Sequence, residues 1–116
     1  MNLQENDYYK CESLREQNII LEHLRNRYKV ISSINTTQDE FLQWPHIYYD
    51  GNEISLSTIN NPGNELIHIW KSSMGFSLSR FNKGNISELT YSEFRHRTGI
   101  NIPPQGDSKL IFKFIR

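Results

Sequence analysis

Two groups of side chains in this chain have the residue types that acid–base chemistry or ligand binding requires. The first lies in the run PHIYYDGNEISLS, residues 45–57, where His46, Tyr48 and Glu53 are predicted to share one face of a β-hairpin. Cross-strand neighbours lie about 5 Å apart, so a histidine beside a carboxylate could act as a general base and a tyrosine as a proton donor. The alternative is a solvent-exposed trio of polar side chains on an open sheet face, which is an ordinary feature of sheets.

The second group is basic and lies in the last third of the chain. Residues 75–116 carry seven basic and three acidic side chains, a net charge of +4, and the remainder carries −4. Basic groups interleaved with aromatic rings could hold phosphates or a single-stranded nucleic acid, and they would equally suit an acidic protein partner. Cations near the end of a helix are also stabilised by its dipole without any ligand, so a purely structural role stays open. The predicted binding residues are Arg80, Lys83, Tyr91, Arg95, His96, Arg97, Lys109 and Lys113.

The hairpin that would position the first group is the clearest local signal in the sequence. Asp50-Gly51 between two β-rich runs is typical of a two-residue turn, and this turn would place Tyr48 opposite Glu53. Because side chains alternate along a strand, two faces are predicted. One face holds Ile47, Tyr49, Ile54 and Leu56, and the other holds His46, Tyr48, Glu53 and Ser55.

Further strands are predicted after the hairpin. The Pro-Gly pair within residues 60–64 indicates a turn, and ELIHIWK, residues 65–71, is apolar on both faces, as in a central strand. His68 within it is expected to be a packed, hydrogen-bonded core histidine. Gly75 then permits a reversal into FSLSRF, residues 76–81. Short connections favour sequential neighbours, which predicts a four-stranded antiparallel meander.

Capping residues indicate where the helices begin. Ser13 followed by Glu16 predicts an amphipathic helix of about five turns, with apolar residues continuing to Ile31. Thr37 and Glu40 repeat the spacing before a helix of a turn or two.

The helix that carries the Arg-His-Arg run is specified at both ends. Thr90 as N-cap, Glu93 three residues later and Gly99 after the last turn predict a short helix at 91–98. A rigid connector then leads to KLIFKFIR, residues 109–116, whose alternating apolar residues predict a final strand. As an edge strand it leaves dimerisation open.

Composition predicts a single α+β domain over residues 1–116, with residues 1–9 frayed. A chain of 116 residues can bury one core, and zero net charge argues against bulk polyanion binding. The first ten residues lack the apolar run of a secretory signal and Cys11 stands alone, so a cytoplasmic protein without membrane contact is expected. No metal-ligand spacing and no glycine-rich phosphate motif occurs, so neither a metal nor a cofactor is expected.

The runs EISLSTI, ELIHIWK, GFSLSR and SELTYSEFRHRTGI resemble the later part of a Src-homology-2 domain, in which three strands precede a helix and a short final strand. The resemblance covers about half of the chain. In that family the strand after the first helix carries an arginine for phosphotyrosine, whereas HIYYD here has no basic residue except His46. The helix followed by a meander is also similar to barnase-like and toxin-type endoribonucleases at the level of fold alone.

We therefore expect a small non-enzymatic interaction protein that binds a protein partner and inhibits or recruits it, of the type encoded by phages and mobile elements. Surfaces rich in Tyr, Arg and His support this expectation, because such residues are common interface anchors. The alternative is an RNA-binding protein or a small metal-independent endoribonuclease that uses His46, Tyr48 and Glu53. That alternative requires the hairpin face and the basic residues to meet in one groove.

Overall fold

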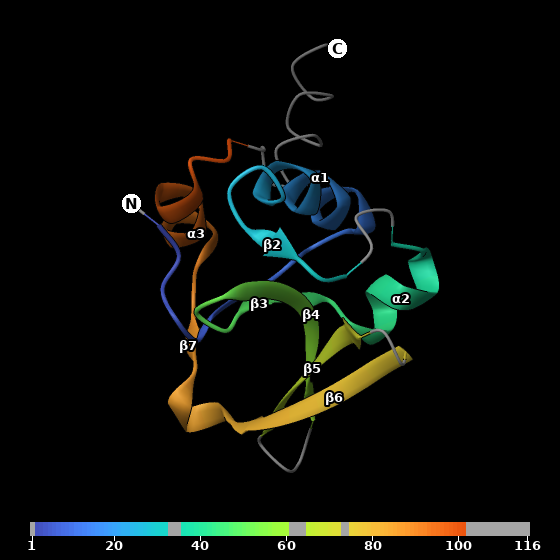
Figure 1. The fold of residues 1–116 in the computed structure, drawn as a ribbon. Helices are drawn as coiled ribbons and strands as arrows, with labels where there is room; N and C mark the ends of the chain where they lie inside the picture. Colours follow the sequence, from blue (N-terminus) through green and yellow to red (C-terminus); the bar gives the residue numbers. More distant parts are fainter. Residues whose placement is uncertain (1, 33–35, 61–64, 73–74, 102–116) are drawn as a thin grey trace.

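The computed structural model describes residues 2–32, 36–60, 65–72 and 75–101, and within them the chain is an α+β fold with three α-helices and a mixed seven-stranded sheet (Figure 1). The helical segments are α1 (Leu14–Leu24), α2 (Gln38–Gln43), α3 (Tyr91–Thr98) and a 3-10 turn, η1 (Lys83–Asn85). The strands are β1 (Asp7–Lys10), β2 (Lys29–Val30), β3 (His46–Tyr49), β4 (Glu53–Asn60), β5 (Glu65–Ser72), β6 (Gly75–Asn82) and β7 (Ser87–Glu88). No helix in these ranges is long and apolar enough to cross a membrane.

The sheet is larger than the four strands predicted. Its order is β6-β5-β4-β3-β1-β7, and β2 pairs with β4 beside this path. Strands β3 to β6 are antiparallel sequential neighbours, whereas β7 pairs parallel with β1 and β2 pairs parallel with β4. The additional strands make the sheet mixed.

The prediction of a frayed segment at residues 1–9 is wrong, because this segment contains β1. The strand lies between β3 and β7, and its residues Asp7, Tyr8 and Tyr9 are all buried. Leu3, just before it, is also buried in the main core. Large tyrosine rings give this short polar-looking segment enough apolar area to be held in the sheet.

Helix α1 begins as predicted but is shorter. The Ser13 hydroxyl accepts a hydrogen bond from the backbone N–H of Glu16 at 3.1 Å, which confirms the N-cap. The helix ends at Leu24, after about three turns rather than five. Beyond it the chain becomes extended, and the N–H of Ile31 bonds to the carbonyl of Ile54 at 2.9 Å. The β-branched residues that follow the helix favour this pairing with β4 over further helical turns.

The two short helices are bounded as their capping residues predict. In α2 the Thr37 side chain and Glu40 form a complete capping box. In α3 Thr90 and Glu93 form another, and Gly99 ends the helix at φ 75°, a left-handed conformation that glycine adopts readily.

Part of the predicted organisation lies outside the described residues. The strand predicted at 109–116, most of its connector and the turn after residue 60 belong to that part. Lys109 and Lys113 belong to it as well.

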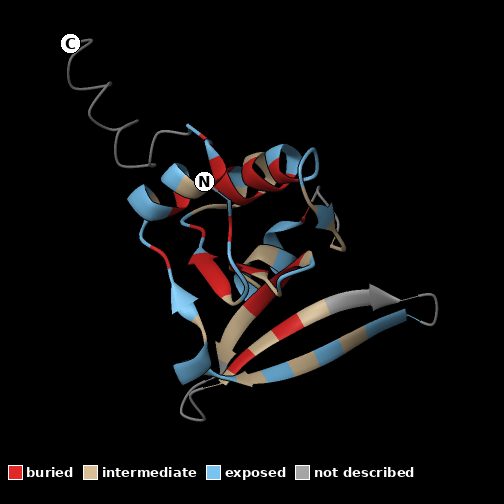
Figure 2. Ribbon diagram, turned by 60° about the vertical axis from the view of Figure 1, so that its left-hand side comes forward, coloured by how far each residue is buried: buried red, intermediate tan, exposed pale blue. Residues whose placement is uncertain are grey.

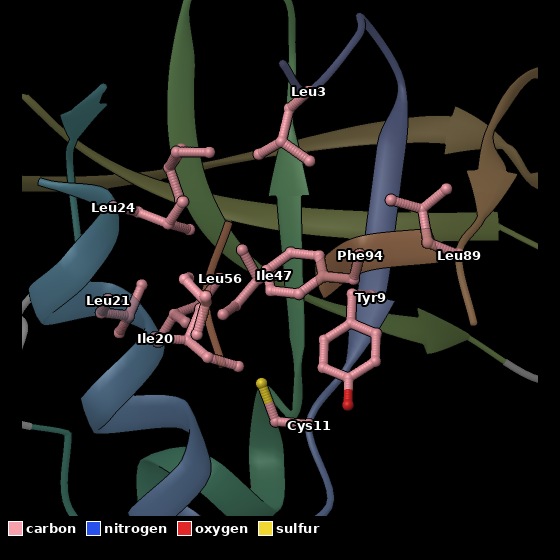
Figure 3. Packing of buried hydrophobic residues seen from close by; sticks show 12 residues of the cluster. Leu3, Tyr9, Cys11, Ile20, Leu21, Leu24, Ile47, Leu56, Leu89 and Phe94 are labelled. Carbon is pink, nitrogen blue, oxygen red and sulfur yellow. The ribbon is translucent and has the colours of Figure 1, made fainter. Parts of the chain in front are cut away.

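The main core lies between the helices and one face of the sheet (Figures 2 and 3). Three apolar residues of α1 face the sheet, and Phe94 of α3 stacks on Tyr9 of β1 with ring centroids 4.5 Å apart. Leu89 is buried in the same cluster. The best-packed members of this cluster are Cys11, Ile20, Leu21, Leu24, Ile47, Ile54, Leu56 and Phe94.

The hairpin register differs from the prediction by two residues. Tyr48 lies opposite Ser55 instead of Glu53, and the backbone N–H of Asp50 bonds to the carbonyl of Glu53 at 3.2 Å, so the turn is centred on Gly51-Asn52 instead of Asp50-Gly51. The Asp50 carboxylate stabilises this turn, because it accepts hydrogen bonds from the backbone N–H groups of Asn52 at 2.8 Å and Glu53 at 2.6 Å. A shift of two residues leaves each side chain on its predicted face.

Candidate interaction surface

Two of the side chains that would be catalytic under the alternative hypothesis, His46 and Tyr48, do not lie on an open sheet face. His46 is 5% exposed and Tyr48 is 1% exposed. Their face forms a second core, in which Tyr48 and Phe81 have ring centroids 5.4 Å apart although two strands separate β3 from β6. In a flat sheet these strands would be about 14 Å apart. The sheet therefore curls, and β6 sweeps beneath β3 and β4 in Figure 1.

Tyr48 and Glu53 have separate structural partners. The Tyr48 hydroxyl donates a hydrogen bond to Oδ1 of Asn6 at 2.7 Å. Burial, with smaller contributions from the Asp50 and Glu5 carboxylates, raises the pKa of Tyr48 to about 12. Glu53 lies 3.1 Å from the ammonium group of Lys29. The arrangement gives Tyr48 a packing role and does not join it to Glu53 as an acid–base pair.

His68 is a packed and hydrogen-bonded core residue, as predicted. Its side chain is 5% exposed, and its Nδ1 lies 2.8 Å from the Ser55 hydroxyl. Burial lowers the pKa of His68, and the Asp50 and Glu53 carboxylates offset only part of this effect. His68 is therefore held in its neutral form inside the curl of the sheet.

The lowered pKa of His68 predicts a loss of stability in mild acid. Below the ordinary histidine pKa of about 6.5 the unfolded chain takes up a proton that the folded chain resists, so the free energy of unfolding falls as the pH falls. We expect urea midpoints of the wild type to decrease between pH 7.5 and 5.5, and to decrease less in His68→Gln. His23→Gln, at an exposed position, is the control and should retain the wild-type slope. An equal slope in all three proteins would contradict the prediction.

The predicted basic residues are divided between two places and are partly neutralised. Arg97 of α3 forms an ion pair with the buried Asp7 at 2.6 Å, and Arg80 of β6 pairs with Glu65 at 3.2 Å. Figures 1 and 2 both place α3 far from β6. The basic residues of α3 and those of β6 thus do not form one patch within the described ranges.

The other predicted binding residues have different settings. Arg95 and His96 are exposed on α3. Tyr91 is partly buried against the main core, and its buried hydroxyl has no hydrogen-bond partner among the residues that the structure describes. Lys83 lies in η1. Arg95 and His96 are thus the predicted binding residues of α3 that are exposed.

The largest exposed apolar side chains lie on β6. Phe76 is 71% exposed and Leu78 is 54% exposed, and Arg80 follows on the same face. We call Phe76, Leu78 and Arg80 the β6 strip. Another large exposed apolar residue, Leu42 at 66%, lies on α2 and is not part of this strip.

The β6 strip is the outer end of an apolar row that crosses the sheet. Directly paired residues on successive strands are Tyr9, Ile47, Leu56, Ile69 and Leu78. The first three are buried under the helices, Ile69 is partly buried, and Leu78 faces solvent. Strand β6 ends the sheet, and no strand in the described part of the chain pairs with its outer side. An apolar face and an open strand edge therefore coincide.

The exposure of this strip was not predicted from the sequence. Phe76 and Leu78 alternate with Ser77 and Ser79, the usual pattern of an apolar face turned toward a core. The inward side of β6 instead carries the serines and Phe81, because the sheet curls toward that side. The curl of the sheet therefore turns Phe76 and Leu78 toward solvent, although their alternation with serines predicts that they face a core.

Glu16 was predicted only as part of a helix cap, whereas the structure buries its carboxylate beneath the loop that precedes α1. Glu16 is 4% exposed, and its Oε1 accepts a hydrogen bond from the N–H of Glu12 at 2.8 Å. The Tyr9 hydroxyl lies 3.3 Å from both carboxylate oxygens. Burial raises the pKa of Glu16 and of the neighbouring Cys11 thiol, which disfavours the reactive thiolate form.

Open depressions also occur on the described surface. A groove of about 730 Å³ lies beside the first loop and α2, and a smaller one of about 500 Å³ lies beside the hairpin loop. The first is lined by Lys10, Cys11, Glu12, Phe41, Leu42 and Pro45, and the second by Glu5, Asn6, Tyr48, Asp50, Phe81 and Asn85. No group of three His, Cys, Asp or Glu side chains suited to a metal ion occurs within the described ranges.

Comparisons with protein families, with curated proteins and with solved structures find no match to this chain. The physical features of its surface are therefore the ground on which a function can be assigned. Of these features, the β6 strip is notable because exposed apolar side chains lie there on the last strand of the described sheet.

Proposed function

We propose that this chain is a small cytoplasmic, non-enzymatic interaction protein that binds a protein partner and inhibits or recruits it. The observation that supports this most strongly is the β6 strip, where Phe76 and Leu78 are 71% and 54% exposed on the last strand of the sheet. Neighbouring exposed apolar side chains mark interaction sites, and an open edge offers backbone groups for strand addition. The small size of the chain and its Asn-, Ile- and Ser-rich composition favour a phage or mobile-element origin.

Protein binding explains the surface better than the alternative of RNA binding or cleavage does. His46 and Tyr48, which would carry the catalysis, are buried in the second core. Arg97 and Arg80, which would hold the RNA backbone, already have carboxylate partners. RNA binding depends on unneutralised cations along the phosphate chain, and the paired arginines reduce that supply.

A partner strand paired with β6 would make two kinds of contact with it. Its backbone would bond to the outward-facing N–H and C=O groups of β6, and its side chains would cover Phe76 and Leu78. Arg80, whose side chain is 57% exposed, would stand at the rim of this contact. Phenylalanine and arginine are both common anchors at interfaces.

The direct test is capture of a partner from a bacterial lysate by the tagged protein, with and without nuclease. We expect a stoichiometric protein to bind the wild type and to survive nuclease. Phe76→Ser/Leu78→Ser should lower its recovery by about tenfold or more, because two anchors are lost. Leu42→Ser removes an equally exposed apolar residue from α2 and should leave recovery unchanged.

Other outcomes would contradict the proposal. Equal recovery with the double β6 variant and the wild type would show that the β6 strip is not the binding surface. Co-purifying RNA, with protein lost on nuclease treatment, would favour the RNA-binding alternative. Circular dichroism of each variant establishes that a loss of capture is not a loss of fold, since exposed substitutions change stability by only about 0.5 kcal/mol.

A further inference from the structure

We infer that one partner of the β6 strip is a second copy of this chain, joined by antiparallel pairing of the two β6 strands about Leu78. The inference uses the surface named in the proposed function and identifies its occupant. It rests on the self-complementary order of residues along β6, GFSLSRFN.

The two ends of the sheet differ in a way that makes β6 the end available for pairing. Strand β7, at one end, has two residues, whereas β6, at the other, has eight. Proteins protect long edge strands with proline, inward-pointing charges or covering segments. Strand β6 has no proline, and its outward face presents Phe76 and Leu78. A long apolar edge of this kind is suited to pairing with another strand.

Symmetry restricts how two β6 strands can pair. Opposed side chains in an antiparallel pair lie on the same face of the sheet. A two-fold axis perpendicular to the sheet keeps the exposed face of one copy beside the exposed face of the other. The residues of the exposed face, Phe76, Leu78, Arg80 and Asn82, must therefore lie opposite members of the same set in the second copy.

Two registers of this kind pair seven residues from each strand. With the axis at Leu78, Leu78 meets its own copy and Phe76 meets Arg80 of the second copy. With the axis at Ser79, Leu78 would meet Arg80 of the second copy instead. The first register is favoured, because it joins apolar to apolar at the centre and places a guanidinium group beside an aromatic ring at each end.

The favoured register also continues the packing of each subunit. The apolar row that ends at Leu78 would pass directly into the same row of the second copy, through Ile69 and Leu56 on both sides. The polar partners would match as well, since Ser77 would face Ser79. One strand pair buries less area than a standard protein interface, so we expect a dissociation constant on the order of 10–100 µM.

Cysteine cross-linking tests the pairing and its register. Leu78→Cys alone should form a covalent dimer with a short thiol-specific cross-linker, because opposed β-carbons lie about 5 Å apart. Phe76→Cys and Arg80→Cys should cross-link when mixed and remain largely monomeric when separate. The wild type, whose cysteine is buried, and Leu42→Cys, exposed on α2, are the controls and should not cross-link.

Sedimentation velocity over about 5–500 µM measures the association without a cross-linker. The wild type should shift from monomer to dimer. Leu78→Lys, which brings two like charges together at the axis, should raise the dissociation constant by about tenfold or more. Leu42→Lys should behave like the wild type.

The results separate this inference from the proposed function. A wild type that stays monomeric, without cross-links at residue 78, would overturn the inference of a second copy. If Phe76→Ser/Leu78→Ser still abolished capture of a different protein, the proposed function would nevertheless stand. A dimer that cross-links between positions 78 and 80 in place of 78 and 78 would overturn the register centred on Leu78.

Discussion

Replacing Arg97 with alanine is expected to lower the free energy of unfolding by about 3 kcal/mol. The Arg97 guanidinium lies 2.6 Å from the carboxylate of Asp7, which is 3% exposed and lies in β1. Without the arginine the donor left to this buried carboxylate among the described residues would be the N–H of Gln4 at 2.7 Å. An uncompensated buried charge is costly because the interior solvates it poorly. Urea unfolding of wild type and variant measures the difference.

Arg95→Ala is the matched control for this prediction. Arg95 lies two residues earlier in the same helix and is exposed, so its loss should change the free energy of unfolding by about 0.5 kcal/mol or less. Asp7→Asn combined with Arg97→Ala should recover part of the lost stability, because the unpaired charge is removed as well. Equal effects of Arg97→Ala and Arg95→Ala would show that the pair does not hold α3 to the sheet.

The ion pair changes how the Arg-His-Arg run is understood. The run has the appearance of a cationic surface in the sequence, yet Arg97 connects α3 to the first strand. The connection spans 90 residues, and no local pattern announces it. Arg95 and His96 are exposed on the same helix.

Predictions from the sequence succeed where the signal is local. Thr90, Glu93 and Gly99 define α3 correctly, because a capping box and a left-handed glycine act within one helical turn. The start of α2 (Gln38–Gln43) and the start of α1 are predicted correctly for the same reason. Strand β5 is likewise recognisable from its continuous apolar run.

Predictions fail where the outcome depends on contacts between distant segments. Strand β1 has four residues and no turn signal, and only its pairing with β3 and β7 makes it a strand. The curl of the sheet has the widest consequences, since it buries His46 and Tyr48 and turns Phe76 and Leu78 outward. Curvature is a property of the whole sheet, whereas alternation along one strand indicates only that its two faces differ. The catalytic hypothesis and the missed β6 strip therefore have the same origin.

Tyr48→Ala is expected to lower the free energy of unfolding by about 3–5 kcal/mol. The ring of Tyr48 is 1% exposed and lies 5.1 Å from the ring of His68 and 5.4 Å from that of Phe81, measured between centroids. Removing it would leave a cavity where β3 meets the curled β5–β6 hairpin. The rigid sheet on either side cannot close this cavity fully, so the cost exceeds that of the lost apolar area alone. Thermal or urea unfolding gives the value.

Tyr48→Phe separates the hydroxyl from the ring. It keeps the packing and removes the hydrogen bond to Asn6, which should cost about 1 kcal/mol. A large loss in alanine with a small loss in phenylalanine is the result expected of a residue that fills the second core. A cost below about 1 kcal/mol for Tyr48→Ala would mean that this face is open to solvent. His46 and Tyr48 would then again be available to a ligand, and the acid–base hypothesis for the hairpin would regain its physical basis.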